Sequence, residues 1–436
     1  MLVSLEFLKN VLNGFKKDIE QDINTLQNVG KIEPSDTDIP IVNLNGSIPI
    51  NKNEVFCVLD YSSLTDSFRA YAKIKIQGRI STSFPKKNFA IELFSDEGTL
   101  IPFNKEFKNW GAHNEYVLKA NWIDHLHARN IASANLWADI VRNRNDFDSL
   151  PEEYKNSPNM CAIDGFPIKV YANGEYQGIY TWNIPKKTWM FNMDKSNPNH
   201  VVLQGNANDL GDYSKEINPC NFNVLWDGKD SDNSWTIEEG KASEALTNSF
   251  NRIPEALMQM AIDGTGKENL ENALDIQSAI NYLIFQEVLF GIDSLGNNLM
   301  LITYDLKKWY LSAYDMDSTL DLNYDGTMLK NPNGMLLNGD GLNKFSFLFA
   351  CLSLSEIYRD RFVSTYKELR KSVLSYSNII SKFEKILSVI DDDVRIEDTV
   401  PYPEIPSVTE NTFVNLKKYL KARLEILDRY FDGMEA

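Results

Sequence analysis

The feature that most constrains the fold is a change of hydrophobic pattern along the chain. Between residues 39 and 100 the sequence consists of short β-rich runs separated by turn residues, which is typical of strands in a sheet. From about residue 243 onward helical patterns dominate, and a long helix is predicted at 411–431. Strands first and helices later predict an α+β fold. The strand runs are residues 39–44, 54–63, 70–81 and 88–95.

Two further elements are predicted between the sheet and the helices. Residues 125–144 place Leu126, Ile131, Leu136 and Ile140 close to a helical stripe. Residues 166–185 form two alternating runs joined by Asn-Gly, which strongly favours a β-hairpin.

The same patterns divide the chain into five segments. Residues 1–29 predict a helix with one apolar seam, and residues 30–38 are rich in helix breakers and predict a linker. Residues 39–200 form a sheet-rich lobe with one helix. Residues 201–242 are polar and lack periodicity, which predicts an irregular insertion that serves as a lid. Residues 243–436 form a helical lobe.

The seam of the first helix has two interpretations. Its apolar positions recur at three- and four-residue steps, as in a short coiled coil. It either packs on its own domain or docks the protein onto a second copy or an assembly. The seam consists of Leu5, Leu8, Leu12, Phe15, Ile19 and Leu26.

Charge and cysteine content exclude several classes of partner and site. The formal net charge is -17, so we expect no nucleic-acid partner, which would require clustered Lys and Arg. Cys57, Cys161, Cys220 and Cys351 have no CxxC spacing, so reduced thiols are expected rather than a zinc site or disulfides.

The location of the protein is also constrained by its apolar runs. The first residues lack the continuous apolar core of a secretory signal, and no run approaches the roughly 20 apolar residues of a membrane span. We expect no membrane partner. The predicted location is the cytoplasm, or a spore coat or virion that the protein reaches through an assembly or by lysis.

Residues 293–317 carry the strongest chemical signal. Asp293 precedes Asn298 by five positions, and an apolar run then leads to Asp315 and Asp317. Phosphoryl transfer needs one carboxylate to orient the attacking hydroxyl, and an amide with another carboxylate to hold the metal. The spacing matches the catalytic loop of protein kinases, although Asp-Met-Asp replaces Asp-Phe-Gly. Taken alone, such a pair also fits a solvated loop or a helix cap.

A second signal lies in residues 72–93, which are predicted to form two strands joined by a turn. This segment contains Gly78, Ser81, Lys86 and Lys87, whose backbone amides, hydroxyl and ammonium groups suit phosphate binding. A hairpin with solvated ends fits the same residues.

A third signal surrounds the helix at 125–144. Lys119 and Asn121 precede it, and Arg129 offers bidentate recognition of a phosphate or carboxylate. Asp124 or Asn121 fits a helix cap. An Arg129 that only lies along its own helix also fits.

Together these blocks resemble the CotH kinase family, atypical protein kinases named for spore coat protein H. The similar blocks run in order from about residue 55 to about residue 330, and phage and prophage members are the most similar. They are residues 74–93, 117–130, 166–180, 293–301 and 314–320.

The resemblance implies a reduced protein-kinase-like fold that binds ATP and Mg²⁺ or Mn²⁺ between a small sheet-rich lobe and a larger helical lobe. By matching motif, Asp293 is the catalytic aspartate, and Asn298, Asp315 and Asp317 are the metal-binding residues. The nucleotide-binding residues are expected to be Lys87 or Lys86, with Gly78, Ser81 and Arg129. The expected partner is a coat or virion protein that offers Ser or Thr as acceptor.

Two departures from the family pattern fall among the residues that are expected to surround the nucleotide. Ile80 stands where a small residue is common, and Asn183 replaces a frequent acid. Asp293, Asn298 and Asp315 are unaffected, so an active protein kinase is predicted. The alternatives are a structural spore-surface or phage-tail component with little or no activity, and transfer of AMP instead of phosphate.

Overall fold

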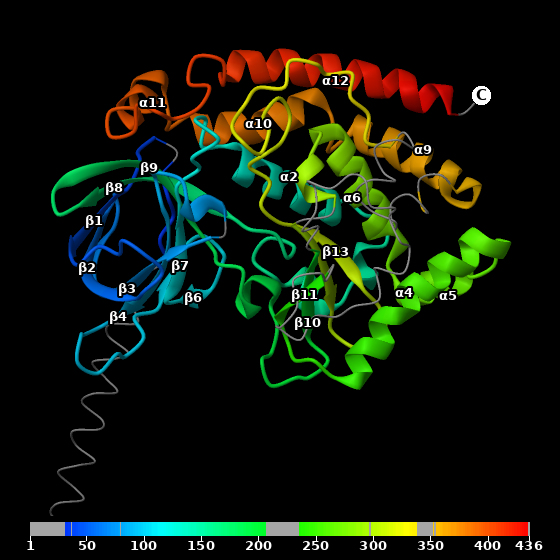
Figure 1. Ribbon diagram of the computed structural model, residues 1–436, viewed down its shortest axis with the longest axis horizontal. Coiled ribbons are helices and arrows are strands. Elements are labelled where there is room, and N and C mark those ends of the chain that lie inside the picture. Colours follow the sequence, from blue (N-terminus) through cyan, green and yellow to red (C-terminus); the bar gives the residue numbers. More distant parts are fainter. Residues whose placement is uncertain are drawn as a thin grey trace, which may run out of the picture.

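Seven of the described strands close into a β-barrel, which forms the blue-to-green half of the molecule in Figure 1. The structure is a computed structural model, and it describes residues 31–35, 37–78, 80–205, 235–295, 298–337, 352 and 355–434. Around the barrel the strand order is β1-β2-β3-β4-β7-β9-β8, and the parallel pairing of β1 with β8 completes the ring. The bounds are β1 Ile41–Gly46, β2 Val55–Ser62, β3 Ser67–Gln77, β4 Asn88–Phe94, β7 Glu115–Lys119, β8 Gly165–Ala172 and β9 Glu175–Asn183.

Alternating side chains explain why these residues form a barrel. In β3, Ala70, Ala72, Ile74 and Ile76 point inward and are buried, while the residues between them face outward. The β8–β9 hairpin turns at Asn173 and Gly174, both with positive φ, as a two-residue hairpin loop of type I′ requires. The predicted hairpin is confirmed. A small pair of strands, β5 Lys105–Glu106 and β6 Ala112–His113, lies outside the ring.

A second sheet lies in the other half of the molecule. Its four strands have the order β11-β10-β12-β13, and β12 and β13 form an antiparallel pair in which Leu299 lies opposite Ala313. Every residue of β12 and β13 is buried, so this hairpin belongs to the core. The bounds are β10 Val201–Gly205, β11 Trp235–Glu239, β12 Leu299–Thr303 and β13 Tyr310–Ala313.

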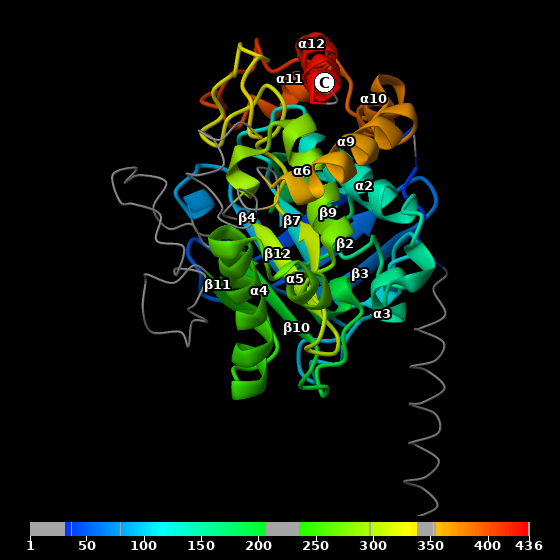
Figure 2. The same ribbon diagram turned by 90° about the vertical axis from the view of Figure 1, so that its right-hand side faces the viewer.

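Helices surround this sheet, with α12 and α10 at one end of the molecule and α4 toward the other (Figure 2). Helix α6 is the central one: nearly all its residues are apolar or buried, as in a core helix, and it contacts α2, α9, α12 and β13. Side-chain caps begin several helices; Asp275, for example, accepts the Ser278 N–H at the start of α6. The bounds are α2 Arg129–Arg142, α3 Glu152–Lys155, α4 Glu244–Asp263, α5 Lys267–Ala273, α6 Ile276–Leu289, α9 Glu356–Lys371, α10 Tyr376–Leu387, α11 Asp392–Asp398 and α12 Phe413–Gly433.

The α+β class and the predicted helices at α2 and α12 are confirmed. Helix α2 packs against α6 and α10, so it belongs with the helical half although it lies within the predicted sheet-rich lobe. Both ends of the predicted irregular insertion, 201–242, contain paired strands, β10 and β11. The predicted helix at 1–29 and the centre of the insertion lie outside the described residues.

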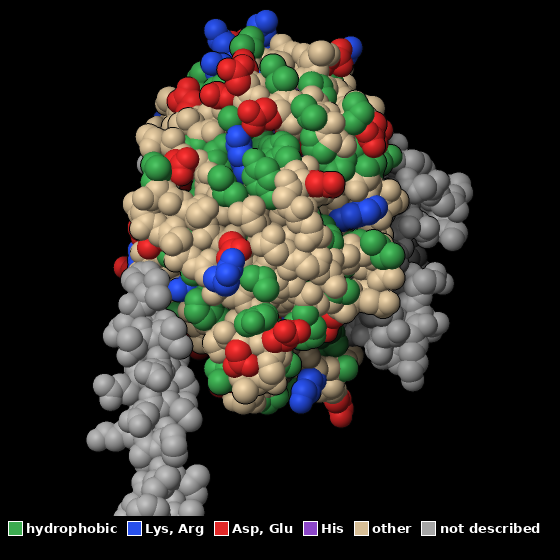
Figure 3. Space-filling model, turned by 90° about the vertical axis from the view of Figure 1, so that its left-hand side faces the viewer, with side chains coloured by type: hydrophobic (Ala, Val, Ile, Leu, Met, Phe, Trp, Pro, Cys, Tyr) green, Lys and Arg blue, Asp and Glu red, His purple; other side chains and the backbone are tan. Residues whose placement is uncertain are grey.

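The barrel side of the molecule carries a mixed surface. Lys, Arg, Asp and Glu side chains are scattered over it, and apolar side chains gather toward the end where α11 lies (Figure 3). Ile396 in α11 and Val400 just after it are 61% and 77% exposed. No helix among the described residues is long and apolar enough to cross a bilayer.

Lys105 predicts an unusual dependence of barrel stability on pH. Its ammonium is buried 4.4 Å from the ring centre of Phe103 and 5.0 Å from that of Phe68, and no hydrogen-bond partner for it is found among the described residues. Burial lowers the pKa of Lys105 to about 8. Below pH 8 the folded protein therefore holds a buried charge that the unfolded chain keeps in water, and this lowers the free energy of unfolding. The loss disappears as the pH rises toward about 10.4.

Lys105→Met should raise the free energy of unfolding at pH 7 by on the order of 1–3 kcal/mol, and the gain should vanish near pH 10.4. Urea unfolding at several pH values measures it. The exposed Lys52→Met is the control and should change the free energy by less than about 0.5 kcal/mol. A gain for Lys105→Met that is constant with pH would show that packing, rather than charge, is responsible.

Candidate functional site

Three acidic side chains and one amide side chain lie at the end of the β12–β13 hairpin where the chain enters and leaves it. Asp293 lies in a short helical turn, Ile292–Ser294, that follows α6, and Asn298 lies just before β12. The Asn298 amide donates a hydrogen bond of 3.0 Å to the Asp293 carboxylate. Asp315 and Asp317 follow β13, and because Leu299 lies opposite Ala313, they leave the hairpin at the end where Asn298 enters it. Local hairpin geometry therefore brings the predicted residues together.

Lys119 is the positive charge of this cluster. It ends strand β7 of the barrel, and its ammonium contacts the Asp315 carboxylate and lies 3.2 Å from Asp317. The side chains of Lys119 and Asp317 are each 16% exposed, and that of Asp315 is 32% exposed. Lys119 thus joins the barrel to the acidic turn of the helical half.

The charges in this cluster do not balance, since two carboxylates share one ammonium. Burial, together with the nearby Asp315 and Asp293, raises the pKa of Asp317 to about 7 against the opposing effect of Lys119. Burial alone would lower the pKa of Lys119, but Asp315 and Asp317 outweigh it and hold that pKa well above its usual value. A carboxylate pair with excess negative charge is suited to an additional cation.

The turn that contains Gly78 lies beside Lys119. Gly78 has φ +119°, and a Cβ there would lie 2.0 Å from the Ser81 Oγ, so the turn closes tightly over its own residues. Asn88 donates to Ser81 (3.3 Å) and accepts the Ala120 N–H (2.7 Å). Asn88 therefore ties the turn to the residue that follows Lys119.

The whole chain was compared with known proteins. A family model described as CotH kinase protein matches residues 74–427. The chain belongs to the CotH kinase family. The resemblance seen in the sequence blocks is thereby confirmed, and family membership supports a kinase-like protein. Comparison with curated proteins finds no match.

The residues of this member of the CotH kinase family fit a metal that binds together with a nucleotide. Among the described residues no group of three or more His, Cys, Asp or Glu side chains is arranged to hold a metal by itself. Magnesium is usually held by one or two carboxylates together with phosphates of the substrate. Asp315 and Asp317, whose carboxylates already share one cation, and the Asn298 amide provide such an oxygen set.

Lys87 and Lys86 have different roles in the structure. Lys87 donates to the carbonyl oxygen atoms of Thr82 (2.9 Å) and Phe84, so it closes its own turn. Lys86 is fully buried, and its ammonium lies 2.8 Å from the Asp398 carboxylate and 2.6 Å from the Ile179 carbonyl oxygen. In this structure Lys86 has a structural role, because its ammonium is buried and held by protein partners; its contact with phosphate stays a prediction.

Asp398 is a point where several parts of the chain meet. Besides Lys86, its carboxylate contacts the His127 Nε2 (3.0 Å) and accepts the Ile179 N–H (2.6 Å). Burial opposes ionisation, but Lys86 and His127 hold the pKa of Asp398 below its usual value. Helix α11 is thereby fastened to the barrel next to the turn that contains Gly78.

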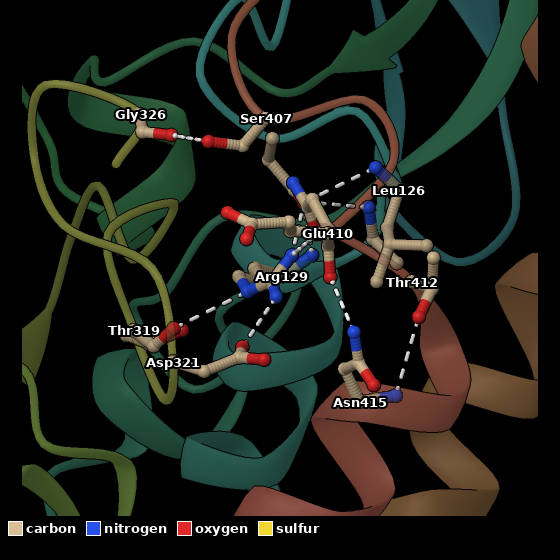
Figure 4. A network of polar contacts seen from close by, with 12 residues as sticks. Leu126, Arg129, Thr319, Asp321, Gly326, Ser407, Glu410, Thr412 and Asn415 are labelled. Carbon is tan, nitrogen blue, oxygen red and sulfur yellow. Dashed lines mark hydrogen bonds and ion pairs between the residues drawn. The ribbon is translucent and has the colours of Figure 1, made fainter. Parts of the chain in front are cut away.

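Arg129 is likewise occupied by protein partners. Its guanidinium, which is fully buried, donates to the Thr319 carbonyl oxygen (3.2 Å) and to Asp321 (2.6 Å), and it also contacts Asp124 and Asn411 (Figure 4). Arg129 is therefore a buried structural residue in this structure, and its contact with nucleotide stays a prediction. The cap prediction for Asp124 is confirmed, since its carboxylate accepts the N–H groups of Ala128 and Arg129.

Lys119 is the residue of this cluster that the sequence interpretation left outside the expected site. The signal for it was present: it lies inside the block 117–130 that resembles the family, directly after the buried apolar run of β7. Its contact with Asp315 joins residues 196 positions apart, and no local pattern reveals such a pair.

Asp398→Ala should destabilise the fold by about 3–5 kcal/mol, because it leaves the buried Lys86 ammonium without its counter-charge. Urea unfolding measures the loss. The matched control is Glu397→Ala, which removes a neighbouring acid of the same helix that is 57% exposed, and it should cost less than about 1 kcal/mol. Equal losses for both variants would contradict the structural role of the buried pair.

Asp317→Asn should stabilise the ligand-free protein above neutral pH. The folded pKa of about 7 exceeds the unfolded value, so the folded state binds more protons between about pH 4 and pH 7 and loses stability as the pH rises through that window. The substitution removes this loss, so its gain should be near zero at pH 4 and on the order of 2 kcal/mol at pH 8. Thermal unfolding at both pH values measures it, with the exposed Glu404→Gln as the control. A gain at pH 4 as large as at pH 8 would contradict the raised pKa.

Proposed function

We propose that this CotH kinase transfers the γ-phosphoryl group of ATP to Ser or Thr side chains of a protein. The observation that supports the proposal most is the placement of Lys119 across Asp315 and Asp317, next to the hydrogen-bonded pair Asp293–Asn298. A phosphate-binding cation, a metal-binding acid pair and a catalytic acid are the groups that phosphoryl transfer requires. They come from the barrel, from the end of α6 and from the end of β13.

Asp293 orients the acceptor hydroxyl and takes its proton as the hydroxyl oxygen bonds to the γ-phosphorus and the bond from that phosphorus to the β–γ bridging oxygen breaks, which releases ADP. The Asn298 amide donates to one oxygen of Asp293, which fixes the carboxylate, and its own carbonyl oxygen remains a ligand for metal. Holding hydroxyl and phosphate in line supplies much of the rate in this reaction class.

Asp315, Asp317 and Asn298 would hold Mg²⁺ or Mn²⁺, which would supply charge neutralisation for the phosphates of the nucleotide. Lys119 turns its ammonium from the carboxylates to the phosphates, which its flexible four-carbon stem permits. The turn with Gly78 and Ser81 lies next to this end of β7 and contributes backbone amides.

In this arrangement the barrel is the nucleotide-side lobe of a kinase-like fold and the helical half is the lobe that binds metal and protein. Lys119 comes from the first and the acids from the second, so ATP binds between them. The adenine-side contacts near Asn183 belong to the same proposal.

The proposed acceptor is a coat or virion protein, reached from the cytoplasm or within a spore coat or particle. Residues 1–29 serve to dock the kinase on such an assembly or on a second copy. Neither nucleic acid nor membrane is part of the proposed partnership.

Incubation with ATP labelled at the γ position, or at the α position, tests the proposal. With Mg²⁺ or Mn²⁺ and a Ser/Thr-rich acceptor, wild type should transfer label only from the γ position. Asp293→Asn and Asp315→Asn should lower kcat by about 10²-fold or more. Lys119→Met should raise KM for ATP as well as lower kcat, and the exposed acid variant Glu97→Gln is the control and should match wild type.

The other outcomes of this experiment separate the alternatives. Label from the α position would mean AMP transfer. If there is no transfer and ATP does not raise the melting temperature, the protein is a structural component that has kept the fold.

A further inference from the structure

Asn130, in the first turn of α2, holds the peptide between the two metal-side acids. Its side chain is 4% exposed, and its Oδ1 accepts the Met316 N–H at 2.9 Å. Met316 is the central residue of the Asp315-Met316-Asp317 turn. A helix from the early part of the chain therefore fixes this turn by a single side-chain acceptor.

The same turn is held on its other side by the segment that carries Asp293. The Met316 sulfur accepts hydrogen bonds from the Ser294 Oγ (3.4 Å) and from the Gln286 amide (3.6 Å). Met316 is 1% exposed, so its side chain is enclosed between α6 and the turn of Asp293. The backbone of Met316 is thus fixed by Asn130 and its side chain by the neighbours of Asp293.

The turn needs such support because its backbone is strained. Asp315 has φ +53°, a left-handed conformation that costs a non-glycine residue free energy unless the surrounding structure imposes it. Directly after the turn, Arg129 binds the Thr319 carbonyl oxygen and Asp321 (Figure 4). Two consecutive residues of α2 therefore hold this part of the chain: Asn130 binds the turn, and Arg129 binds the residues that follow it.

We infer that Asn130 is a positioning residue for the metal site: by accepting the Met316 N–H it keeps Asp315 and Asp317 aimed at one cation. This inference rests on the proposed function, since it concerns the metal of that same site. The flexible Lys119 side chain can follow either carboxylate, whereas a divalent cation needs both within its coordination distance at once. Loss of the Asn130 acceptor therefore weakens metal binding more than it weakens the fold.

Titration of Mn²⁺ followed by electron paramagnetic resonance, with a non-hydrolysable ATP analogue present, tests the inference without measuring activity. Asn130→Ala should raise the Kd for Mn²⁺ by about 10-fold or more, as is typical when the support of a metal ligand is removed. Asn130→Asp keeps an oxygen acceptor and should bind Mn²⁺ within about threefold of wild type or more tightly. The control is Asn143→Ala, at the exposed C-terminal end of the same helix, which should bind as wild type does.

Each outcome separates this inference from the proposed function. If Asn130→Ala binds Mn²⁺ as tightly as wild type, Asn130 does not position the acids, and the metal site stands. If Asn130→Asp is as weak as Asn130→Ala, the acceptor role is overturned. If wild type itself binds no Mn²⁺, the metal role of Asp315 and Asp317 falls, and the inference falls with it. Should Asn130→Ala fail to fold, Asn130→Ser, whose hydroxyl is too short to reach Met316, takes its place with the same expected result.

Discussion

The sharing of one ammonium by two carboxylates links the two halves of this protein. Lys119 belongs to the barrel, and Asp315 and Asp317 belong to the helical half. Removing three charged groups from water is costly, and only close contacts between them offset the cost. Because two carboxylates share one ammonium, the contact that joins the halves also offers negative charge to an added cation. In the proposed function, stability and chemistry therefore depend on the same three side chains.

The acidic part of the site could be predicted from the sequence because its geometry is local. Asp293, Asn298, Asp315 and Asp317 flank one hairpin, so spacing alone determines that they meet. The basic part could not be predicted in the same way. Lys86, Lys87 and Lys119 have similar surroundings in the sequence, and contacts with distant residues decide their roles.

In the fold, too, the features that depend on neighbouring residues could be predicted, and those that depend on residues far apart in the sequence could not. Alternating runs predicted the strands, and Asn173-Gly174 predicted the hairpin, since both depend on neighbouring residues. Closure of the sheet into a barrel depends on the parallel pairing of β1 with β8, whose partners Ile41 and Lys169 are far apart in the sequence. Strands β10 and β11 were missed because each is short and borders a polar segment that hides its pattern.

The pairing of Lys86 with Asp398 has a consequence for the order in which the protein matures. Lys86 and Asp398 are 312 positions apart, so during synthesis Lys86 has no counter-charge from Asp398 until most of the chain has left the ribosome. Until then the barrel either keeps this ammonium in water, with the neighbouring turn open, or buries it without compensation. The turn beside the site therefore reaches its final arrangement only after α11 has been made, because the counter-charge of Lys86 is missing until then.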